Sequence, residues 1–283
     1  MSSSTKGTVL ITGCSDDGAG SALAAEFDAH GYRVFATSRS LKTMSKVENL
    51  PNVKTLELDI TKTAQIRAAA ETVASETGGE LTYLVNCAAR NYFMPLLDQD
   101  IEDCKAVFET NVWGQLAVTQ AFAPLLMKAK GTVVFITSVS GYLNVPYQGL
   151  YAASKRSEQI MAETLRLELA PFHVKVLSVV TGALKTMGQT HFEDWKLPAG
   201  SLYSPIEPTI KDRARGQEGA PRMEPCDYAK GVVNDIIRGR TGTIWHGASV
   251  GAVKFGTSWL PTWMMDSGVQ MKTGLDVLAQ QNK

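Results

Sequence analysis

The sequence has no long hydrophobic run and no excess of charge of either sign. None of its 283 residues lies in a run of 18 apolar residues, the length at which a membrane-spanning helix becomes a candidate. The N-terminal MSSSTKGTVLITG lacks the cationic stretch and apolar region of a signal peptide, so we expect a cytoplasmic protein. Lys plus Arg and Asp plus Glu number 28 each, and this neutral balance gives no reason to expect a nucleic-acid partner.

Cysteine and histidine are also scarce, and neither is arranged as a metal site. The cysteines, none of which forms a CxxC pair, are Cys14, Cys87, Cys104 and Cys226. The histidines are His30, His173, His191 and His246. We therefore expect reduced thiols and no metal ion. Only His191 is placed to touch a substrate, and an exposed loop histidine is the simpler interpretation of it.

Short apolar runs rich in β-branched residues alternate with helix-like segments. The runs are Thr8 to Thr12, Arg33 to Ser38, Val53 to Leu58, Leu81 to Asn86, Thr132 to Thr137 and Val174 to Val180. Strands that are apolar on both faces and separated by helices predict a parallel sheet covered by helices on both sides. Because no linker divides the chain, we predict one doubly wound α/β domain over residues 1–283.

The prediction divides this domain into three segments. Residues 7–182 form the cofactor and catalytic core, and residues 226–283 form a C-terminal helix, a last strand and an apolar tail. Between them, residues 183–225 are rich in proline, glycine and charge, which is typical of a substrate lid, although an ordinary surface insertion has the same composition.

Four basic residues lie within the predicted lid. They are Lys211, Arg213, Arg215 and Arg222. They could bind a phosphate on the substrate. Asp212 and Glu218 are interspersed among them, which favours a solvated surface of mixed charge.

A glycine-rich turn follows the first predicted strand and leads directly into a helix. Such a turn lets the backbone approach a pyrophosphate, whose charge is stabilised by the helix N-terminus. The residues we predict to bind a dinucleotide here are Gly13, Ser15, Gly18, Ala19 and Gly20.

The second predicted strand ends at Ser38 and Arg39 without an acidic neighbour. An NAD-selective site carries an acidic residue at this position, and a basic group accommodates the additional phosphate of NADP. Arg39 therefore favours NADP(H), and the alternative is an arginine that merely faces solvent.

Tyr151 and Lys155 stand four residues apart, thirteen residues after Ser138 in TSVSGYLNVPYQGLYAASK. On a helix the two side chains lie on one face, where the ammonium would stabilise the phenolate and favour proton transfer near neutral pH. Ser138 could donate a hydrogen bond to the same substrate oxygen. A tyrosine and a lysine at this spacing can equally be a solvated helix face. In the same helix, Met161, Leu165 and Leu169 form an apolar stripe that predicts core packing.

Taken together, these motifs resemble the short-chain dehydrogenase/reductase family, which implies a Rossmann fold and carbonyl reduction. TGCSDDGAG resembles the family's TGxxxGxG loop, and Ser138, Tyr151 and Lys155 resemble its catalytic residues. The resemblance assigns Asn111 to a water relay. The remaining cofactor contacts that it implies are Asp59, Asn86, Ala88, Gly182, Leu184 and Thr186.

The chain departs from the family pattern at three places. Asp16 and Asp17 add carboxylates to the glycine loop, where they would repel a pyrophosphate unless they cap the following helix or point away. Cys87 and Ala89 replace an asparagine and a glycine after the fourth strand, and Thr181 replaces a proline. These changes concern cofactor affinity more than chemistry.

The TGCS opening, the VVTG segment and the WLPTW tail resemble most closely the fungal 1-acyldihydroxyacetone-phosphate reductases and their secondary-metabolite relatives. The apolar tail around Trp259 and Trp263 could cover a substrate pocket, form an oligomer contact or rest on a lipid surface. We favour the first two because no polybasic cluster flanks it. We accordingly expect a homodimer or homotetramer, with peripheral association with the endoplasmic reticulum or lipid droplets as the alternative.

The leading hypothesis is an NADP(H)-dependent oxidoreductase acting on a ketone or secondary alcohol of an apolar, lipid-like or secondary-metabolite substrate. Two other classes remain. One is a nucleotide-binding regulator that has lost turnover, and the other is an isomerase or cyclase that uses the tyrosine as an acid.

Overall fold

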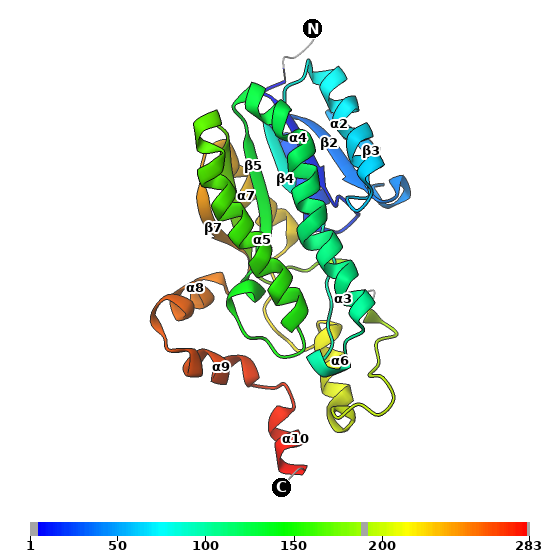
Figure 1. The fold of residues 1–283 in the computed structure, drawn as a ribbon, viewed down its shortest axis with the longest axis vertical. Coiled ribbons are helices and arrows are strands. Elements are labelled where there is room, and N and C mark those ends of the chain that lie inside the picture. Colours follow the sequence, from blue (N-terminus) through cyan, green and yellow to red (C-terminus); the bar gives the residue numbers. More distant parts are fainter. Residues whose placement is uncertain (1–4, 188–191, 282–283) are drawn as a thin grey trace.

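A computed structural model describes residues 5–187 and 192–281 (Figure 1), so the interpretation of His191 falls outside the described residues. One parallel sheet has the strand order β3-β2-β1-β4-β5-β6-β7. Its strands are β1 (Thr8–Thr12), β2 (Arg33–Ser38), β3 (Val53–Glu57), β4 (Tyr83–Asn86), β5 (Thr132–Ser138), β6 (Lys175–Thr181) and β7 (Gly242–His246).

The sheet forms from these segments because their side chains are apolar on both faces. Every residue of the central strand β5, TVVFITS, is buried. The chain crosses from β3 at one edge back to β4 beside β1, so the sequence order of the strands reverses between β1 and β4. In open α/β sheets ligands bind at the carboxyl ends of the strands near such a reversal.

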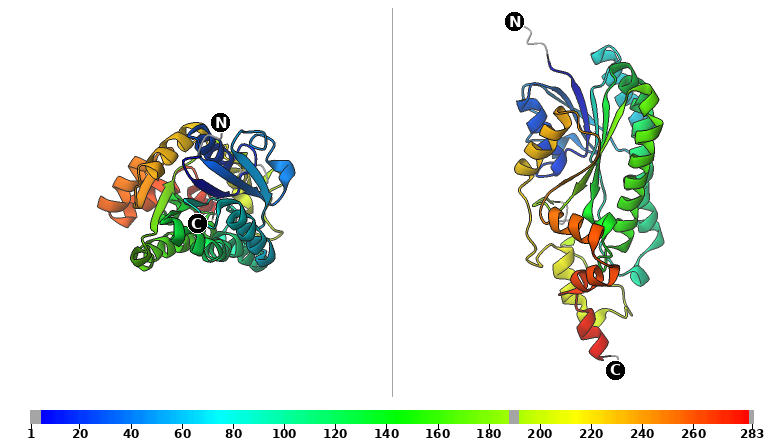
Figure 2. Two further views of the ribbon diagram at one scale, coloured as in Figure 1. Left: turned by 90° about the horizontal axis from the view of Figure 1, so that it is seen from above. Right: turned by 90° about the vertical axis from the view of Figure 1, so that its left-hand side faces the viewer.

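Helices cover both faces of the sheet. They are α1 (Ala19–Ala29), α2 (Thr63–Thr77), α3 (Ile101–Phe108), α4 (Gln115–Ala129), α5 (Gly149–Glu168), α6 (Glu207–Ala214), α7 (Pro225–Ile237), α8 (Val250–Trp259), α9 (Thr262–Gln270) and α10 (Leu275–Gln281). Figure 2 shows α1 and α7 on one face and α2, α4 and α5 on the other. A separate apolar core fills each interface, with Phe27 and Tyr228 in the first and Phe122 in the second.

The predicted doubly wound parallel sheet is confirmed, and the strand expected between residues 226 and 283 is β7. Within the described ranges, no helix has the length and apolar character that crossing a membrane requires. The segment 183–225 contains α6, and an isolated bridge between Leu184 and Met223 joins its two ends.

The C-terminal helices α8, α9 and α10 extend away from the sheet (Figure 1). Pro261 separates α8 from α9. Trp259 and Trp263 are 77% and 68% exposed, respectively. Neither tryptophan therefore covers a pocket of its own chain.

Truncating the buried ring of Phe122 tests the core between α4 and the sheet. Phe122 is fully buried, so we expect Phe122→Ala to lower the free energy of unfolding by about 3–5 kcal/mol. Leu97 is 75% exposed, and Leu97→Ala should change it by less than about 0.5 kcal/mol. Urea unfolding of both variants measures the difference. Equal losses would contradict the described packing.

Candidate active site

The turn between β1 and α1 lies against the segment that follows β4. Gly13 has a φ of 77°, and a Cβ atom there would lie 2.7 Å from the Cα of Ala88. At Gly20 a Cβ would collide with the carbonyl oxygen of Gly13. Glycine is therefore required at both positions for the loop to close, and it leaves backbone rather than side chain facing the edge of the sheet.

The hydroxyl of Thr12 holds this turn to the β4 segment. Its Oγ1 accepts hydrogen bonds from the backbone amides of Cys87 (2.9 Å) and Ala88 (3.0 Å). Sequence reasoning treated Thr12 only as part of the loop motif. Its place at the last residue of a buried strand was the available signal, because a polar side chain there must find a partner at the sheet edge.

The N-terminus of α1 is open to the same edge. Its N-cap is Gly18, and in the described part of the chain no side chain caps the helix. The first amides of a helix lack partners within the helix, and with its dipole they attract an anion. The open helix end and the glycine turn fit the pyrophosphate of a dinucleotide.

The two carboxylates of the loop point away from this end. Asp16 accepts hydrogen bonds from the amide (3.1 Å) and hydroxyl (2.8 Å) of Ser45 and from the amide of Lys46 (2.9 Å). Burial alone would raise the pKa of Asp16, but these hydrogen bonds outweigh it and lower the pKa below its usual value. Asp17 forms an exposed ion pair with the Lys46 ammonium. Both carboxylates hold the segment after β2.

Three hydroxyls meet where β1 and β2 end. Ser15 Oγ lies 3.0 Å from Ser38 Oγ and 3.3 Å from Thr43 Oγ1, and the last two are 2.9 Å apart. Arg39 follows β2 directly, and its side chain is exposed. The end of β2 thus offers hydroxyls and a cation.

Asn86 lies at the end of β4, and Asp59 follows β3, with β2 and β1 between these two strands. Asn86 is fully buried and donates to Thr119 Oγ1 (2.9 Å), whereas its own Oδ1 has no partner among the described residues. Asp59 accepts hydrogen bonds from the amide (2.9 Å) and hydroxyl (2.8 Å) of Thr61. An unpartnered buried acceptor beside the glycine turn is consistent with a bound polar group at this edge.

Ser138 and Tyr151 flank one loop at the end of β5. Ser138 is the last residue of β5, and its Oγ accepts from the amide of Ser140 (3.1 Å). Tyr151 lies in the first turn of α5 and is half-buried. Across residues 5–187 and 192–281, its hydroxyl has no hydrogen-bond partner.

Lys155 is buried beneath Tyr151 on the same helix. Its Nζ donates to the carbonyl of Ile136 on β5 (2.9 Å) and to Glu158 Oε2 (2.7 Å). Burial alone would lower the pKa of Lys155, but the neighbouring carboxylate and Tyr151 outweigh it and raise the pKa, so the ammonium is charged at neutral pH. Lys155 also interacts electrostatically with the Cys87 thiol.

Asn111 lies in a π-helical segment, Glu109–Gly114, which joins α3 to α4. Its Oδ1 accepts from the Arg90 amide (2.7 Å), and its Nδ2 donates to the Arg90 carbonyl and Ser154 Oγ (both 2.9 Å). The side chain therefore ties the β4 segment to α5.

The packing of the segment after β6 depends on a glycine and a threonine. A Cβ at Gly182 would collide with the backbone of Ala248. Thr181, which stands where proline is common, lies 2.8 Å from the buried Tyr228 hydroxyl through its Oγ1. Leu184 packs against the core beneath α1 and α7, and the Thr186 amide donates to the Leu184 carbonyl (3.1 Å).

The buried face of α5 is largely polar. It comprises Ser154, Lys155, Glu158, Gln159 and Ala162. Leu165 and Leu169 pack in the core as predicted, but the prediction was wrong for Met161, which is not part of it. Hydrophobic periodicity could not reveal Glu158 and Gln159, because a buried polar face looks like a solvated face in sequence.

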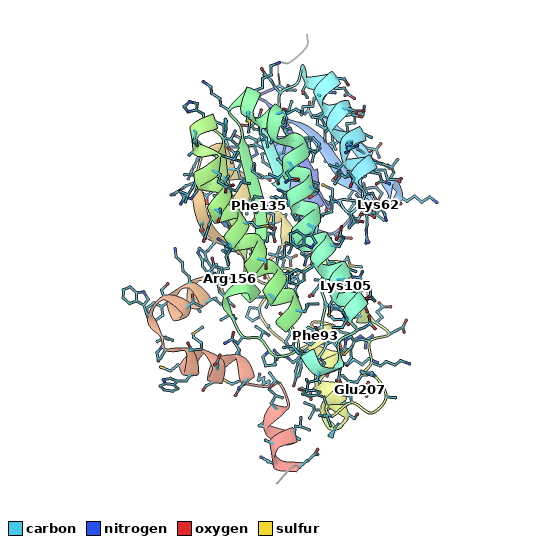
Figure 3. The ribbon with its side chains drawn as sticks, in the orientation of Figure 1. Lys62, Phe93, Lys105, Phe135, Arg156 and Glu207 are labelled. Atoms are coloured by element: carbon cyan, nitrogen blue, oxygen red, sulfur yellow. The ribbon has the colours of Figure 1, made fainter. Side chains whose placement is uncertain are left out.

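An aromatic cluster joins the lid to the loop between Ser138 and Tyr151. Figure 3 shows Phe93 between the start of α5 and the lid, and Trp195 Nε1 donates to the Phe93 carbonyl. Tyr147 packs in this cluster and donates to the Thr273 carbonyl in the tail (2.8 Å). A cavity of about 580 Å³ lies nearby, but Arg156 and Tyr142 line it rather than Tyr151 or Ser138. It therefore lies apart from the Ser138 and Tyr151 side chains.

The predicted phosphate-binding residues of the lid are partly paired within the chain. Arg222 forms an ion pair with Glu218 (2.7 Å), and Arg213 donates to the Lys272 carbonyl (3.3 Å). The Arg222 contact matches the mixed-charge interpretation, whereas Arg213 contacts a backbone carbonyl.

The family model for short chain dehydrogenase matches residues 7–197, so the chain belongs to this family of enzymes. A short-chain dehydrogenase from Penicillium ochrochloron is 43% identical over 260 residues, covering 92% of this chain and 95% of the relative. The NADPH-dependent 1-acyldihydroxyacetone phosphate reductase of Schizosaccharomyces pombe is 33% identical, covering 93% of each chain. The crystal structure of a short chain dehydrogenase from Burkholderia cenocepacia in complex with NADP has a TM-score of 0.75 and 25% identity, covering 94% of this chain and 98% of that one.

The contacts of Asp16 generate a test of the glycine loop. Asp16→Ala removes the acceptor for the Ser45 and Lys46 amides, so their hydrogen exchange should accelerate by roughly tenfold. In the wild type this protection should persist above pH 3.8 and fade only in acid, because the folded carboxyl has a lowered pKa.

Asp17→Ala is the matched control for this exchange experiment by NMR. Asp17 pairs with the Lys46 side chain and not with either amide. The control should leave both amides protected. Equal acceleration in the two variants would show that Asp16 does not hold this segment.

Proposed function

We propose that this enzyme is an NADP(H)-dependent oxidoreductase that interconverts a ketone and a secondary alcohol on an apolar substrate. The observation that carries the proposal is the position of Tyr151. Its hydroxyl has no hydrogen-bond partner in the described part of the chain and stands on α5 one turn from the buried ammonium of Lys155, beside Ser138 at the end of β5.

A bound nicotinamide would supply the hydride that reduces the carbonyl carbon. Tyr151 would donate its proton to the carbonyl oxygen as that oxygen becomes negative, and Ser138 would stabilise the charge by a hydrogen bond. For this step Ser138 must either release the Ser140 amide or keep that bond and donate its own hydroxyl hydrogen to the carbonyl oxygen. The Lys155 ammonium would stabilise the resulting phenolate until Tyr151 regains a proton from solvent.

Residues at three strand ends would hold the cofactor. The Gly13 turn and the α1 N-terminus would bind the pyrophosphate, and Asn86 and Ala88 would contact the cofactor next to it. The preference for NADP rests on Arg39 with the hydroxyls of Ser15, Ser38 and Thr43, since these groups can bind an additional phosphate. The NADPH dependence of the fission-yeast relative and the NADP in the bacterial structure support it.

The aromatic cluster supports an apolar substrate. Phe93, Tyr147 and Trp195 come from three segments that pack together at the loop between Ser138 and Tyr151. The name of the fission-yeast relative adds an acyl-dihydroxyacetone phosphate as one lipid-like candidate, and the fungal dehydrogenases add secondary metabolites. We further propose a homodimer or homotetramer in the cytoplasm, because Trp259 and Trp263 expose an apolar surface.

Removing the Tyr151 hydroxyl tests the reaction. Tyr151→Phe should bind NADPH with wild-type affinity but lose at least about 100-fold in turnover, because it lacks the acid. The measurement is NADPH oxidation with a panel of apolar ketones that includes an acyl-dihydroxyacetone phosphate. Tyr142→Phe, which removes a hydroxyl from the same loop, should retain turnover.

Wild-type turnover in Tyr151→Phe would refute the assignment of the acid. If the wild-type enzyme binds NADPH but oxidises it with no ketone of the panel, the regulatory class is favoured. Conversion of a substrate without net oxidation of NADPH would favour an isomerase or cyclase.

Replacing Arg39 tests cofactor selectivity. Arg39→Ala should weaken NADPH binding by about tenfold or more, equivalent to at least about 1.4 kcal/mol, and leave NADH binding unchanged. Lys42→Ala, an exposed cation in the next turn, is the control and should affect neither. Fluorescence titration measures both affinities. Tighter binding of NADH than NADPH by the wild type would contradict the role of Arg39.

A further inference from the structure

A carboxylate is buried beside the lysine of the catalytic helix. Glu158 is fully buried, and its Oε2 accepts from Lys155 Nζ at 2.7 Å. Its other oxygen, Oε1, receives no hydrogen bond from any residue in the described ranges. A charge in such a place is costly unless it is paired, so Lys155 and Glu158 determine each other's ionisation.

The groups that face this pair from other elements carry no charge near neutral pH. From the end of β4 comes the Cys87 thiol, whose pKa burial raises to about 12 against the opposing effect of Lys155. Tyr228 on α7 interacts electrostatically with Cys87, and burial raises the pKa of the Tyr228 hydroxyl well above its usual value. The strand β5 contributes the Ile136 carbonyl, which accepts from Lys155 Nζ, and the Asn111 amide of the π-helical segment contacts the neighbouring Ser154 hydroxyl. Tyr151 is the remaining ionisable neighbour of Lys155.

The charge that Tyr151 experiences therefore depends on Glu158. When Glu158 is ionised, the pair has no net charge and the field of the ammonium at Tyr151 is largely cancelled. When Glu158 is protonated, the full positive charge of Lys155 acts on the phenol and favours loss of its proton.

We infer that Glu158 is a positioning residue that balances the charge of Lys155 and thereby sets how readily Tyr151 releases its proton. This inference rests on the proposed acid role of Tyr151. No bond to substrate is made or broken by Glu158, which acts only through the ammonium that it contacts.

The pKa of Glu158 lies above the usual value of a carboxyl group. Burial raises its pKa to about 7, although Lys155 opposes the rise. Below this pH the carboxyl is protonated and Tyr151 is the stronger acid. Above it the ion pair is neutral and Tyr151 holds its proton more tightly. Tyr151 would therefore stay protonated, and able to act as the acid in reduction, up to a higher pH than it would beside an unpaired lysine.

Ultraviolet titration of the cofactor-free protein tests this coupling. In the wild type, subtracting the titration curve of Tyr151→Phe isolates the phenolate absorbance of Tyr151. In Glu158→Gln, subtracting the curve of the double variant Tyr151→Phe/Glu158→Gln isolates the same absorbance. Glu158→Gln removes the negative charge with little change of shape. We expect the Tyr151 midpoint to move to lower pH by roughly one unit in this variant.

Glu168→Gln is the matched control, because it makes the same chemical change at an exposed position of α5. Its Tyr151 midpoint should equal that of the wild type. In turnover measurements, the alkaline limb of the reduction profile should move to lower pH in Glu158→Gln alone. An unchanged or raised midpoint in Glu158→Gln would overturn the inference.

Infrared difference spectroscopy of the wild type keeps the test valid if Glu158→Gln fails to fold. Between pH 5 and 9 we expect one carboxylic acid C=O band to disappear with a midpoint of about 7. An acid band that persists at pH 9 would also overturn the inference, because Glu158 would then stay protonated and carry no charge to balance Lys155. Because this readout and the ultraviolet titration need no substrate, they fail or succeed independently of the proposed reaction.

Discussion

The parallel pairing of β1 with β4 and of β4 with β5 is the constraint on which the site depends. Ile11 pairs with Val85, and Val85 with Val134, so the loops that follow these strands emerge at one edge. Only in this register does the Thr12 hydroxyl reach the amides after β4 while Gly13 packs against Ala88. A shift of one residue would turn every side chain to the opposite face and separate the nucleotide loop from the catalytic strand.

The orientation of α5 depends on a different interaction. Hydrophobic contact alone would let this helix rotate, but its buried face carries polar groups that each require a partner. Lys155 reaches the Ile136 carbonyl, and Gln159 Oε1 accepts from Thr137 (2.9 Å) and Ser178. These bonds fix the rotation of α5 on β5 and β6. Tyr151 is thereby held toward the sheet edge, at the cost of burying two charges.

Local patterns predicted the strands, the glycine loop and the spacing of Tyr151 and Lys155, because each depends on neighbours in sequence. The direction of the Asp16 carboxylate was not predictable, since its partner Ser45 lies 29 residues away and becomes a neighbour only after folding. The buried carboxylate of Glu158 was hidden for a related reason. From the sequence, a polar residue on a helix is expected to be exposed to solvent. Only the packing of α5 on the sheet shows that Glu158 is buried.

The substrate side is assembled from segments much farther apart than the cofactor side. Asn144 donates to Asp266 (2.9 Å) and Tyr147 to the Thr273 carbonyl, which joins the loop between Ser138 and Tyr151 to the C-terminal tail. The lid joins the same loop through the aromatic cluster. Changes in residues 183–225 or in the tail can therefore reshape the surface around this loop while the sheet keeps Ser138, Tyr151 and Lys155 in place. Because the contacts that shape this surface come from segments outside that motif, the motif alone does not determine what binds there.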